Sequence, residues 1–292
     1  MKLRFKHQKF QADAAKAVVD VFAGQPYLTP SYMIDRGYEG KTMKGEEFSQ
    51  ISATEEQDFT GWSNHKIVPE LSDRLILEHL QKIQRENQIE PSPKLEGRYN
   101  LTVEMETGVG KTYTYIKTMY ELNRAYGWSK FIVVVPSIAI REGVYKTFQV
   151  TEEHFAEEYG KKIRFFIYNS AQLTEIDRFA SDSSINVMII NSQAFNARGN
   201  DARRIYMKLD EFRSRRPIDI IAKTNPILII DEPQSVEGKK TKENLKQFNP
   251  LLTLRYSATH KSDSIYNMVY RLDAIDAYNK RLVKKIAVKG IS

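Results

Sequence analysis

A short glycine-rich segment, Met105–Thr112, constrains the fold of this 292-residue chain more than any other feature of the sequence. It reads Met-Glu-Thr-Gly-Val-Gly-Lys-Thr, follows an apolar run, and precedes a stretch with helical character at Tyr113–Tyr126. A strand, a glycine-rich turn and a helix in this order form a phosphate-binding loop, in which backbone N–H groups and the helix N-terminus face an anion. A structural glycine turn is the alternative that the segment alone leaves open.

The residue types inside this segment suit a nucleoside triphosphate with its metal ion. Glycines at 108 and 110 allow a tight turn whose N–H groups point inward. The Lys111 side chain can reach the β- and γ-phosphates, and the Thr112 hydroxyl can ligate Mg²⁺. Met105 stands where the strict pattern has its first glycine. The predicted ATP-binding residues of the loop are Glu106, Thr107, Gly108, Val109, Gly110, Lys111 and Thr112.

Six short apolar runs alternate with helical stretches from Tyr99 onward. They are rich in β-branched residues and apolar on both faces, which is typical of buried parallel strands. This alternation predicts an α/β fold, with a parallel sheet covered by helices on both faces. The expected strands are Leu101–Met105, Phe131–Val135, Ile163–Tyr168, Val187–Ile190, Ile227–Ile230 and Leu251–Tyr256.

The residues before Tyr99 have a different texture. Gln8–Phe22 has the apolar spacing of an amphipathic helix, and a second helix is expected over about residues 70–88. Residues 24–69 show no clear period, so we interpret them as a partly ordered insertion. We therefore expect an N-terminal helical extension with an insertion over 1–98, an ATP-binding lobe over 99–270, and a linker over 271–292.

Two adjacent acids, Asp231 and Glu232, end the apolar run at Ile227–Ile230. Ligands of open α/β sheets bind at the carboxyl ends of the strands. We expect Asp231 to hold Mg²⁺ through water, and Glu232 to orient and deprotonate the water that attacks the γ-phosphate. An acidic pair after a strand is common by itself, and only its combination with the loop at Lys111 points to a nucleotide site.

A third strand end carries small hydroxyl side chains in the segment Arg255–His260. Ser257 and Thr259 could hydrogen-bond the acidic pair and couple it to the γ-phosphate side of the site. An ordinary turn at a strand end is the alternative interpretation.

Composition narrows the class of protein. The chain has no cysteine, which excludes disulfides and thiolate metal sites and favours the cytoplasm. It has no apolar segment of the ~18 residues that a membrane span needs, so no membrane partner is expected. The net charge of +7 is compatible with a polyanionic partner. Two basic clusters, each of which could also be a solvated surface, are Arg203, Arg204, Lys208, Arg213, Arg215 and Arg216, and Lys280, Arg281, Lys284, Lys285 and Lys289.

Together these segments resemble the motor domains of the superfamily 2 helicases, which are built on a RecA-like P-loop sheet. The resemblance implies that Lys111 and Glu232 act in catalysis, that Asp231 and Thr112 face the metal, and that Gln11 reads the adenine edge. It also implies DNA contacts by Pro136 and Ser137, and by Ser192 and Gln193. An exposed helical glutamine and plain strand-to-helix turns are the alternatives for these last residues.

Three further phrases narrow the resemblance to the restriction (Res) subunit of type III restriction–modification enzymes. They are Asp231–Gln234, Val135–Val144 and Arg271–Tyr278. The resemblance implies double-stranded DNA as the track, ATP with Mg²⁺ as the fuel, and a methyltransferase (Mod) subunit as partner. We expect the chain to be an N-terminal fragment without the second motor lobe and nuclease, with very slow ATP hydrolysis by itself.

Two other functions remain open from the sequence: the first lobe of another superfamily 2 DNA or RNA helicase, and an ATP-binding interaction module without motor activity. A transporter ATPase is disfavoured because the chain has no Leu-Ser-Gly-Gly-Gln signature. A kinase is disfavoured because the acidic pair and Ser257–Thr259 suit motor hydrolysis better.

Overall fold

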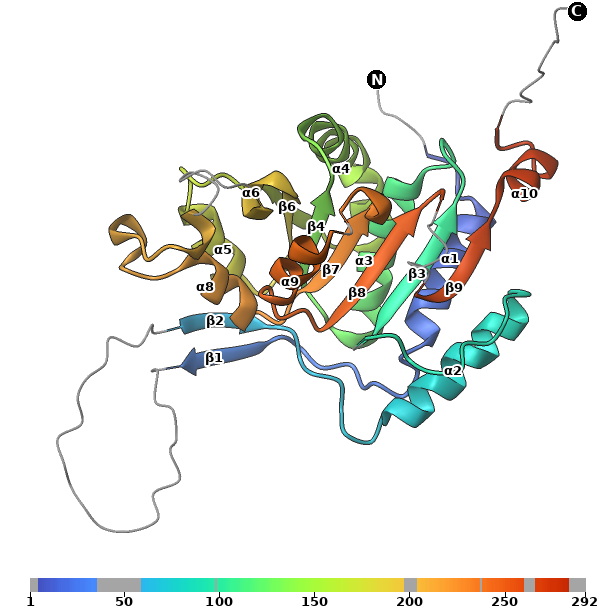
Figure 1. The fold of residues 1–292 in the computed structure, drawn as a ribbon, viewed down its shortest axis with the longest axis horizontal. Coiled ribbons are helices and arrows are strands. Elements are labelled where there is room, and N and C mark those ends of the chain that lie inside the picture. Colours follow the sequence, from blue (N-terminus) through green and yellow to red (C-terminus); the bar gives the residue numbers. More distant parts are fainter. Residues whose placement is uncertain are drawn as a thin grey trace, which may run out of the picture.

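The computed structural model describes residues 5–35, 59–97, 99–196, 204–236, 238–259 and 266–283. Parallel strands form the centre of this part of the chain: β3 (Asn100–Met105), β4 (Lys130–Val135), β5 (Ile163–Ile167), β6 (Ile185–Asn191), β7 (Ile227–Asp231), β8 (Leu252–Ser257) and β9 (Asn267–Leu272). They make one sheet in the order β5-β6-β4-β7-β8-β3-β9 (Figure 1). Because they are parallel, their carboxyl ends lie along one edge.

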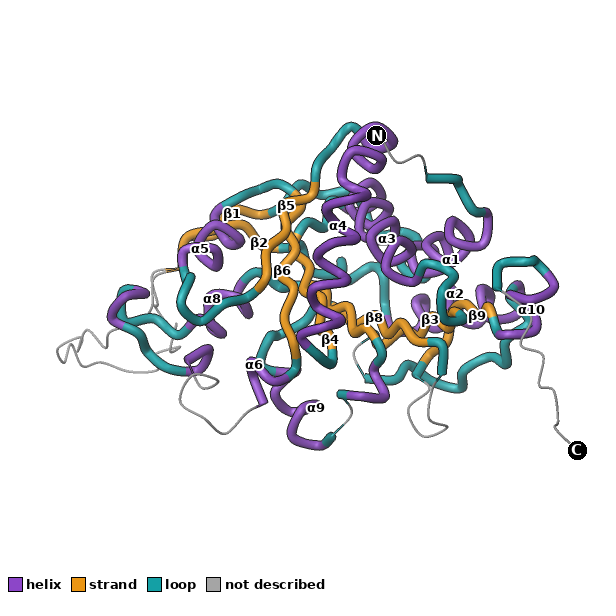
Figure 2. Tube along the Cα trace, turned by 90° about the horizontal axis from the view of Figure 1, so that it is seen from above, coloured by secondary structure: helices purple, strands orange, loops and turns teal. Residues whose placement is uncertain are grey.

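Helices cover both faces of the sheet (Figure 2). The longer ones are α1 (Lys9–Asp20), α2 (Asp73–Glu86), α3 (Lys111–Tyr126) and α4 (Ile138–Tyr159). The shorter ones are α5 (Thr174–Ser181), α6 (Gln193–Asn196), α8 (Pro217–Lys223), α9 (Lys239–Lys246) and α10 (Ala274–Asn279). Three 3₁₀ turns complete the described elements: Arg204–Tyr206, Asp210–Phe212 and Pro233–Ser235.

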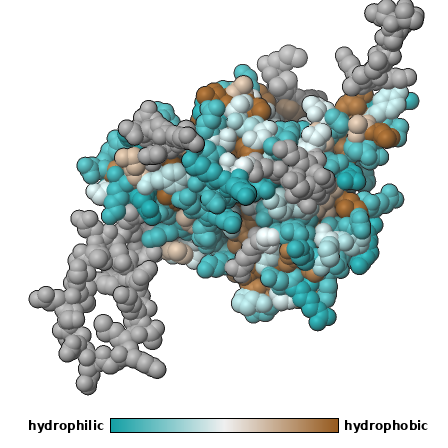
Figure 3. Space-filling model, in the orientation of Figure 1, coloured by the Kyte–Doolittle hydropathy of each residue, from teal (hydrophilic) through white to brown (hydrophobic). Residues whose placement is uncertain are grey.

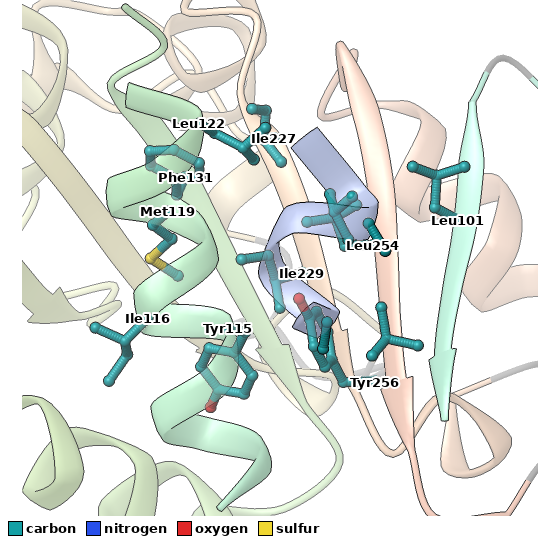
Figure 4. Close-up of a cluster of buried hydrophobic side chains, with 14 of the residues drawn as sticks. Leu101, Tyr115, Ile116, Met119, Leu122, Phe131, Ile227, Ile229, Leu254 and Tyr256 are labelled. Carbon is teal, nitrogen blue, oxygen red and sulfur yellow. The ribbon is translucent and has the colours of Figure 1, made fainter. Parts of the chain in front are cut away.

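The alternation of side chains along β4 shows how the two faces are filled. Phe131, Val133 and Val135 belong to the core that packs under α1, α3 and α4. Ile132 and Val134 belong to the core on the other face, under α5, α8 and α9. All five are fully buried, as the apolar character of the run on both faces predicts. Close-packed side chains on the first face are shown in Figure 4.

The predicted fold class is confirmed: the chain is an α/β protein with a parallel sheet and helices on both faces. All six expected strands are present. The seventh strand, β9, was not predicted; it pairs with β3 at the edge of the sheet, and only its Arg271 is exposed. Since β9 runs to Leu272, the sheet continues past residue 270. The three-part division of the chain stays a prediction.

Part of the expected insertion is ordered around a short antiparallel pair, β1 (Ser31–Asp35) and β2 (Phe59–Ser63). Asn64, which directly follows β2, joins the β1–β2 pair to the main sheet through side-chain hydrogen bonds. Its side-chain amide donates to the carbonyls of Lys130 and Asn225, at 2.9 Å each, and its carbonyl oxygen accepts from the backbone N–H of Ser129 and Lys130. These are polar contacts between distant segments, which no local period in the sequence signals.

The face of the molecule shown in Figure 3 is mainly hydrophilic, with hydrophobic surface over α10. Two apolar side chains of this helix are exposed, Ile275 and Tyr278. Among the helices that the structure describes, none combines the length and the apolar character needed to cross a membrane.

Candidate active site

The predicted phosphate loop joins the carboxyl end of β3 to the first residue of α3. Gly108 and Gly110 have φ angles of +82° and +92°, in the left-handed region that favours glycine. Lys111 and Thr112 form the start of α3, where the N–H groups of the first turn have no partner inside the helix. One loop donor is engaged, since the N–H of Thr107 donates to the Glu106 carboxylate at 2.7 Å. The local geometry is therefore that of an anion-binding turn.

Gln11 of α1 contacts this loop through a hydrogen bond. Its buried side chain donates to the carbonyl of Val109 at 3.1 Å. A Cβ atom added at Gly110 would lie 2.8 Å from the Gln11 amide nitrogen, whereas one at Gly108 would meet nothing within 4 Å. Gln11 also lines a cavity of about 350 Å³ beside the loop, together with Phe10, Tyr113 and Thr147.

We expect Gly110→Ala to destabilise the chain by about 1 kcal/mol more than Gly108→Ala. Both substitutions force alanine into a left-handed conformation, at a cost of roughly 1–2 kcal/mol. Only the change at Gly110 also displaces the Gln11 amide, and a lost hydrogen bond costs on the order of 1 kcal/mol. Denaturant unfolding of the two variants measures the difference. Equal free energies of unfolding would show that the contact between Gln11 and the loop does not contribute to stability.

Asp231 is the buried member of the acidic pair. Its Oδ2 atom accepts from the Tyr115 hydroxyl at 3.5 Å, while its Oδ1 atom has no hydrogen-bond partner within the described part of the chain. Burial, together with the negative charge of Glu232, raises the pKa of Asp231 to about 6. A buried carboxylate oxygen without a partner is costly in a folded protein unless a ligand completes it. This oxygen, with the Thr112 hydroxyl, is a donor set that suits Mg²⁺.

Glu232 lies at the centre of a hydrogen-bond network. Its backbone has a φ of +51°, and its N–H donates to the carbonyl of Tyr256 at 2.9 Å. Its carboxylate accepts from Lys111 at 2.9 Å, from the Gln234 amide at 2.6 Å and from the Ser257 hydroxyl at 2.9 Å. Burial alone would raise the pKa of Glu232, but the hydrogen bonds from Lys111 and Gln234 lower it below its ordinary value. Glu232 is thus held ionised beside a neighbour whose pKa is raised.

Ser257, the last residue of β8, connects this strand to the acidic pair through hydrogen bonds. Its Oγ atom lies 2.9 Å from the Gln234 side-chain oxygen, in addition to the Glu232 carboxylate, and 2.6 Å from the Thr259 carbonyl. The hydroxyl has one proton, so only one of these acceptors takes it at a time. The backbone N–H of Thr259 donates to Ser257 Oγ at 3.2 Å. Thr259 therefore joins the network through its backbone, although the prediction assigned the contact to its hydroxyl.

Two residues of this network had no individual role in the sequence analysis, although Gln234 belongs to the phrase Asp231–Gln234 noted there. Gln234 hydrogen-bonds both Glu232 and Ser257, and Tyr115 contacts Asp231. The position of Tyr115 held a usable signal, because residues four apart in a helix share a face, and Tyr115 follows Lys111 by four.

The two predicted DNA-contact segments lie side by side. Pro136 and Ser137 follow β4, Ser192 and Gln193 follow β6, and these strands are neighbours in the sheet. The Ser192 hydroxyl donates to the Pro136 carbonyl at 3.3 Å, and Ser137 caps α4 by accepting from the N–H of Ile140. The role of these residues in binding DNA stays a prediction.

The described arginines of the first basic cluster are mostly engaged in ion pairs. Arg204 pairs with Glu211, Arg215 with Asp177, and Arg216 with Asp219. These pairs reduce the positive charge available to a polyanion. Arg203 of this cluster, and Lys284, Lys285 and Lys289 of the second, lie outside the described residues.

The sheet order, the left-handed glycines of the loop and the acidic pair at a strand end define a RecA-like P-loop α/β domain. Residues 46–262 match the family model described as "Type III restriction enzyme, res subunit", which is more than half of the chain. The chain therefore belongs to the family of type III restriction enzyme res subunits. This membership agrees with the narrower of the two resemblances found in the sequence.

Curated relatives agree with the family match. The type III restriction-modification enzyme EcoP15I Res subunit of Escherichia coli is 37% identical over 205 residues, covering 64% of this chain and 21% of the relative. The EcoPI Res subunit of Escherichia phage P1 is 34% identical over 259 residues, covering 81% of this chain and 26% of the relative. The chain thus spans only about a quarter of the length of the relatives that it matches.

Among solved structures, a SWI2/SNF2 ATPase core of Sulfolobus solfataricus in complex with double-stranded DNA aligns with 70% of this chain and 36% of its own. The alignment has 13% identity and a TM-score of 0.39. At this level of similarity it does not bear on the function of the chain.

Proposed function

We propose that this chain binds ATP with Mg²⁺ and acts as the first motor lobe of a DNA-dependent ATPase, as part of a type III restriction endonuclease. The observation that carries the proposal is the hydrogen-bonded chain from Lys111 through Glu232 to Ser257. It connects the phosphate loop, the acidic pair and the end of β8, which are the three segments that hydrolysis and its coupling to movement require.

In this proposal Lys111 exchanges partners when the nucleotide binds. Its ammonium lies 2.9 Å from Glu232 Oε1, and both side chains are mostly buried. Entry of the β- and γ-phosphates gives Lys111 stronger anions at the mouth of the loop, and Glu232 is freed to face the attacking water. Glu232 then orients this water and accepts its proton, as a general base does. Ser257, which contacts the same carboxylate, transmits the change to β8.

Asp231 and Thr112 would hold the metal ion, which would supply positive charge to neutralise the phosphates when bound. The Oδ1 atom of Asp231, which has no hydrogen-bond partner among the described residues, supports this assignment. Gln11 reads the adenine edge from the cavity beside the loop, where Phe10 and Tyr113 supply apolar walls. Its present hydrogen bond to Val109 also links occupancy of this cavity to the loop.

Double-stranded DNA is the proposed track, since the curated relatives are restriction-modification enzymes. The carboxyl ends of β4 and β6 present Pro136, Ser137, Ser192 and Gln193 on one surface, where hydroxyl and backbone groups contact phosphates. A methyltransferase (Mod) subunit is the proposed partner, and the cytoplasm is the proposed location.

A substitution at Ser192 tests the DNA surface. Ser192→Asp places a negative charge beside the expected phosphates, which costs about 1 kcal/mol in water, or about a fivefold loss of affinity. Ser183→Asp is the matched control, because Ser183 is exposed just before the opposite end of β6. Titration of a fluorescent duplex at several salt concentrations measures both variants. Equal affinity of the two variants at every salt concentration would show that the carboxyl ends of β4 and β6 do not form the DNA surface.

A further inference from the structure

Tyr115 of α3 contacts Asp231, one of the two residues proposed to hold the metal ion. Its hydroxyl is 3.5 Å from Oδ2 of Asp231, and Thr112, the other residue, lies three positions earlier in α3. The side chain is completely buried. A polar group with this degree of burial needs a partner, and here the partner is a carboxylate of the proposed metal site.

The chemistry of the two groups fixes the direction of their hydrogen bond. An ionised carboxylate only accepts, so the Tyr115 hydroxyl donates its single proton to Oδ2 of Asp231. In this arrangement the Oδ1 atom of Asp231 is left for a ligand. Oδ1 is the atom that has no other partner within the described residues.

The Tyr115 ring is held in place by the core. It packs edge-on against the ring of Tyr256 in β8, with the centroids 5.5 Å apart and the planes at 68° (Figure 4). Tyr256 is fixed in turn, because its hydroxyl lies 2.9 Å from the Thr118 hydroxyl, one turn further along α3. A ring locked between a helix and a strand holds its hydroxyl at one point.

We infer that Tyr115 is a positioning residue for the magnesium site, whose hydroxyl orients Asp231 by bonding its Oδ2 atom and leaving Oδ1 for the metal ion. The inference rests on the proposed function, since it requires a metal–nucleotide complex at this site. Outer-shell partners of metal ligands typically contribute 10–100-fold to metal affinity. Tyr115 would thus set how much Mg²⁺ strengthens nucleotide binding, while touching neither the nucleotide nor the ion.

The test is the substitution Tyr115→Phe, which removes the hydroxyl and keeps the ring that fills the core. The matched control is Tyr256→Phe, which removes the neighbouring buried hydroxyl of the same ring pair but leaves Asp231 and Thr112 untouched. Calorimetric titration with a non-hydrolysable ATP analogue, with Mg²⁺ and with EDTA, gives the gain in affinity due to the metal ion. Circular dichroism establishes that each variant is folded.

We expect Tyr115→Phe to bind the analogue in EDTA as the wild type does. The factor by which Mg²⁺ strengthens binding should be about tenfold smaller than in the wild type. Tyr256→Phe should keep the whole gain. With Mn²⁺ in place of Mg²⁺, the electron paramagnetic resonance spectrum of the bound ion should change in Tyr115→Phe only. An unchanged gain in Tyr115→Phe, or an equal loss in both variants, would overturn the inference. Absence of any Mg²⁺ effect in the wild type would instead contradict the proposed function.

Discussion

The substitution Lys111→Ala should abolish most ATP binding and leave the fold intact. Lys111 is the cation of the phosphate loop, and the ion pair that it forms with Glu232 places it at the mouth of the site. Hydrogen bonds between charged groups are worth about 1.5–3 kcal/mol each. Losing those to the β- and γ-phosphates should therefore weaken ATP binding by about a hundredfold, or ~3 kcal/mol. Glu232 keeps its bonds from Gln234 and Ser257, so the loop should remain folded.

Calorimetric titration with ATP and Mg²⁺ measures this loss, and circular dichroism checks the fold. The matched control is Lys146→Ala, which removes the same charge from an exposed position on α4. It should bind ATP as the wild type does. If folded Lys111→Ala kept wild-type affinity, the loop would not be the phosphate site.

Glu232→Gln should separate ATP binding from hydrolysis. A glutamine amide cannot accept a proton from water, and loss of a general base typically slows a reaction by about 10²–10⁴-fold. Binding should be preserved or tightened, because the substitution releases Lys111 from the ion pair that competes with the phosphates. From the sequence, Glu232 was expected to take no part in ATP binding. The ion pair with Lys111 adds the expectation that ATP affinity stays the same or rises in Glu232→Gln.

Single-turnover hydrolysis, with the chain in excess over labelled ATP, is sensitive enough to follow even slow chemistry. The contrasting variant is Asp231→Asn, which removes the charge proposed to face the metal ion and should weaken the effect of Mg²⁺ on binding. Wild-type turnover in Glu232→Gln would refute its role as the base. Weaker ATP binding in Glu232→Gln would show that the pair with Lys111 does not compete with the nucleotide.

The sequence predicted the central part of the fold because its signals there are local. A strand such as β4 is apolar at every position, since both faces are covered, and the glycine-rich loop shows where a strand gives way to a helix. The edge strand β9 was missed because Asn267 and Arg271 interrupt its apolar residues, although every residue of the strand except Arg271 is buried. The β1–β2 pair was missed because its two strands are far apart in the sequence and are secured by Asn64.

The candidate site was predicted to a similar extent. Residues proposed to contact the nucleotide or its metal ion carry recognisable chemistry, so Lys111, Asp231 and Glu232 could be named from their positions after strands. Residues that act only by positioning these three carry no such recognisable chemistry. The contact of Gln234 with Glu232 became visible only in the folded 3₁₀ turn after β7. Tyr115 became visible only because the packing of α3 brings its hydroxyl to Asp231.

The central claim is that Met105–Thr112 and the acidic pair together form one ATP–Mg²⁺ site. Its most direct test is calorimetric titration of the wild-type chain with ATP, first with Mg²⁺ and then with EDTA. We expect binding at one site per chain, strengthened by Mg²⁺. A folded chain that binds no ATP under either condition would contradict it.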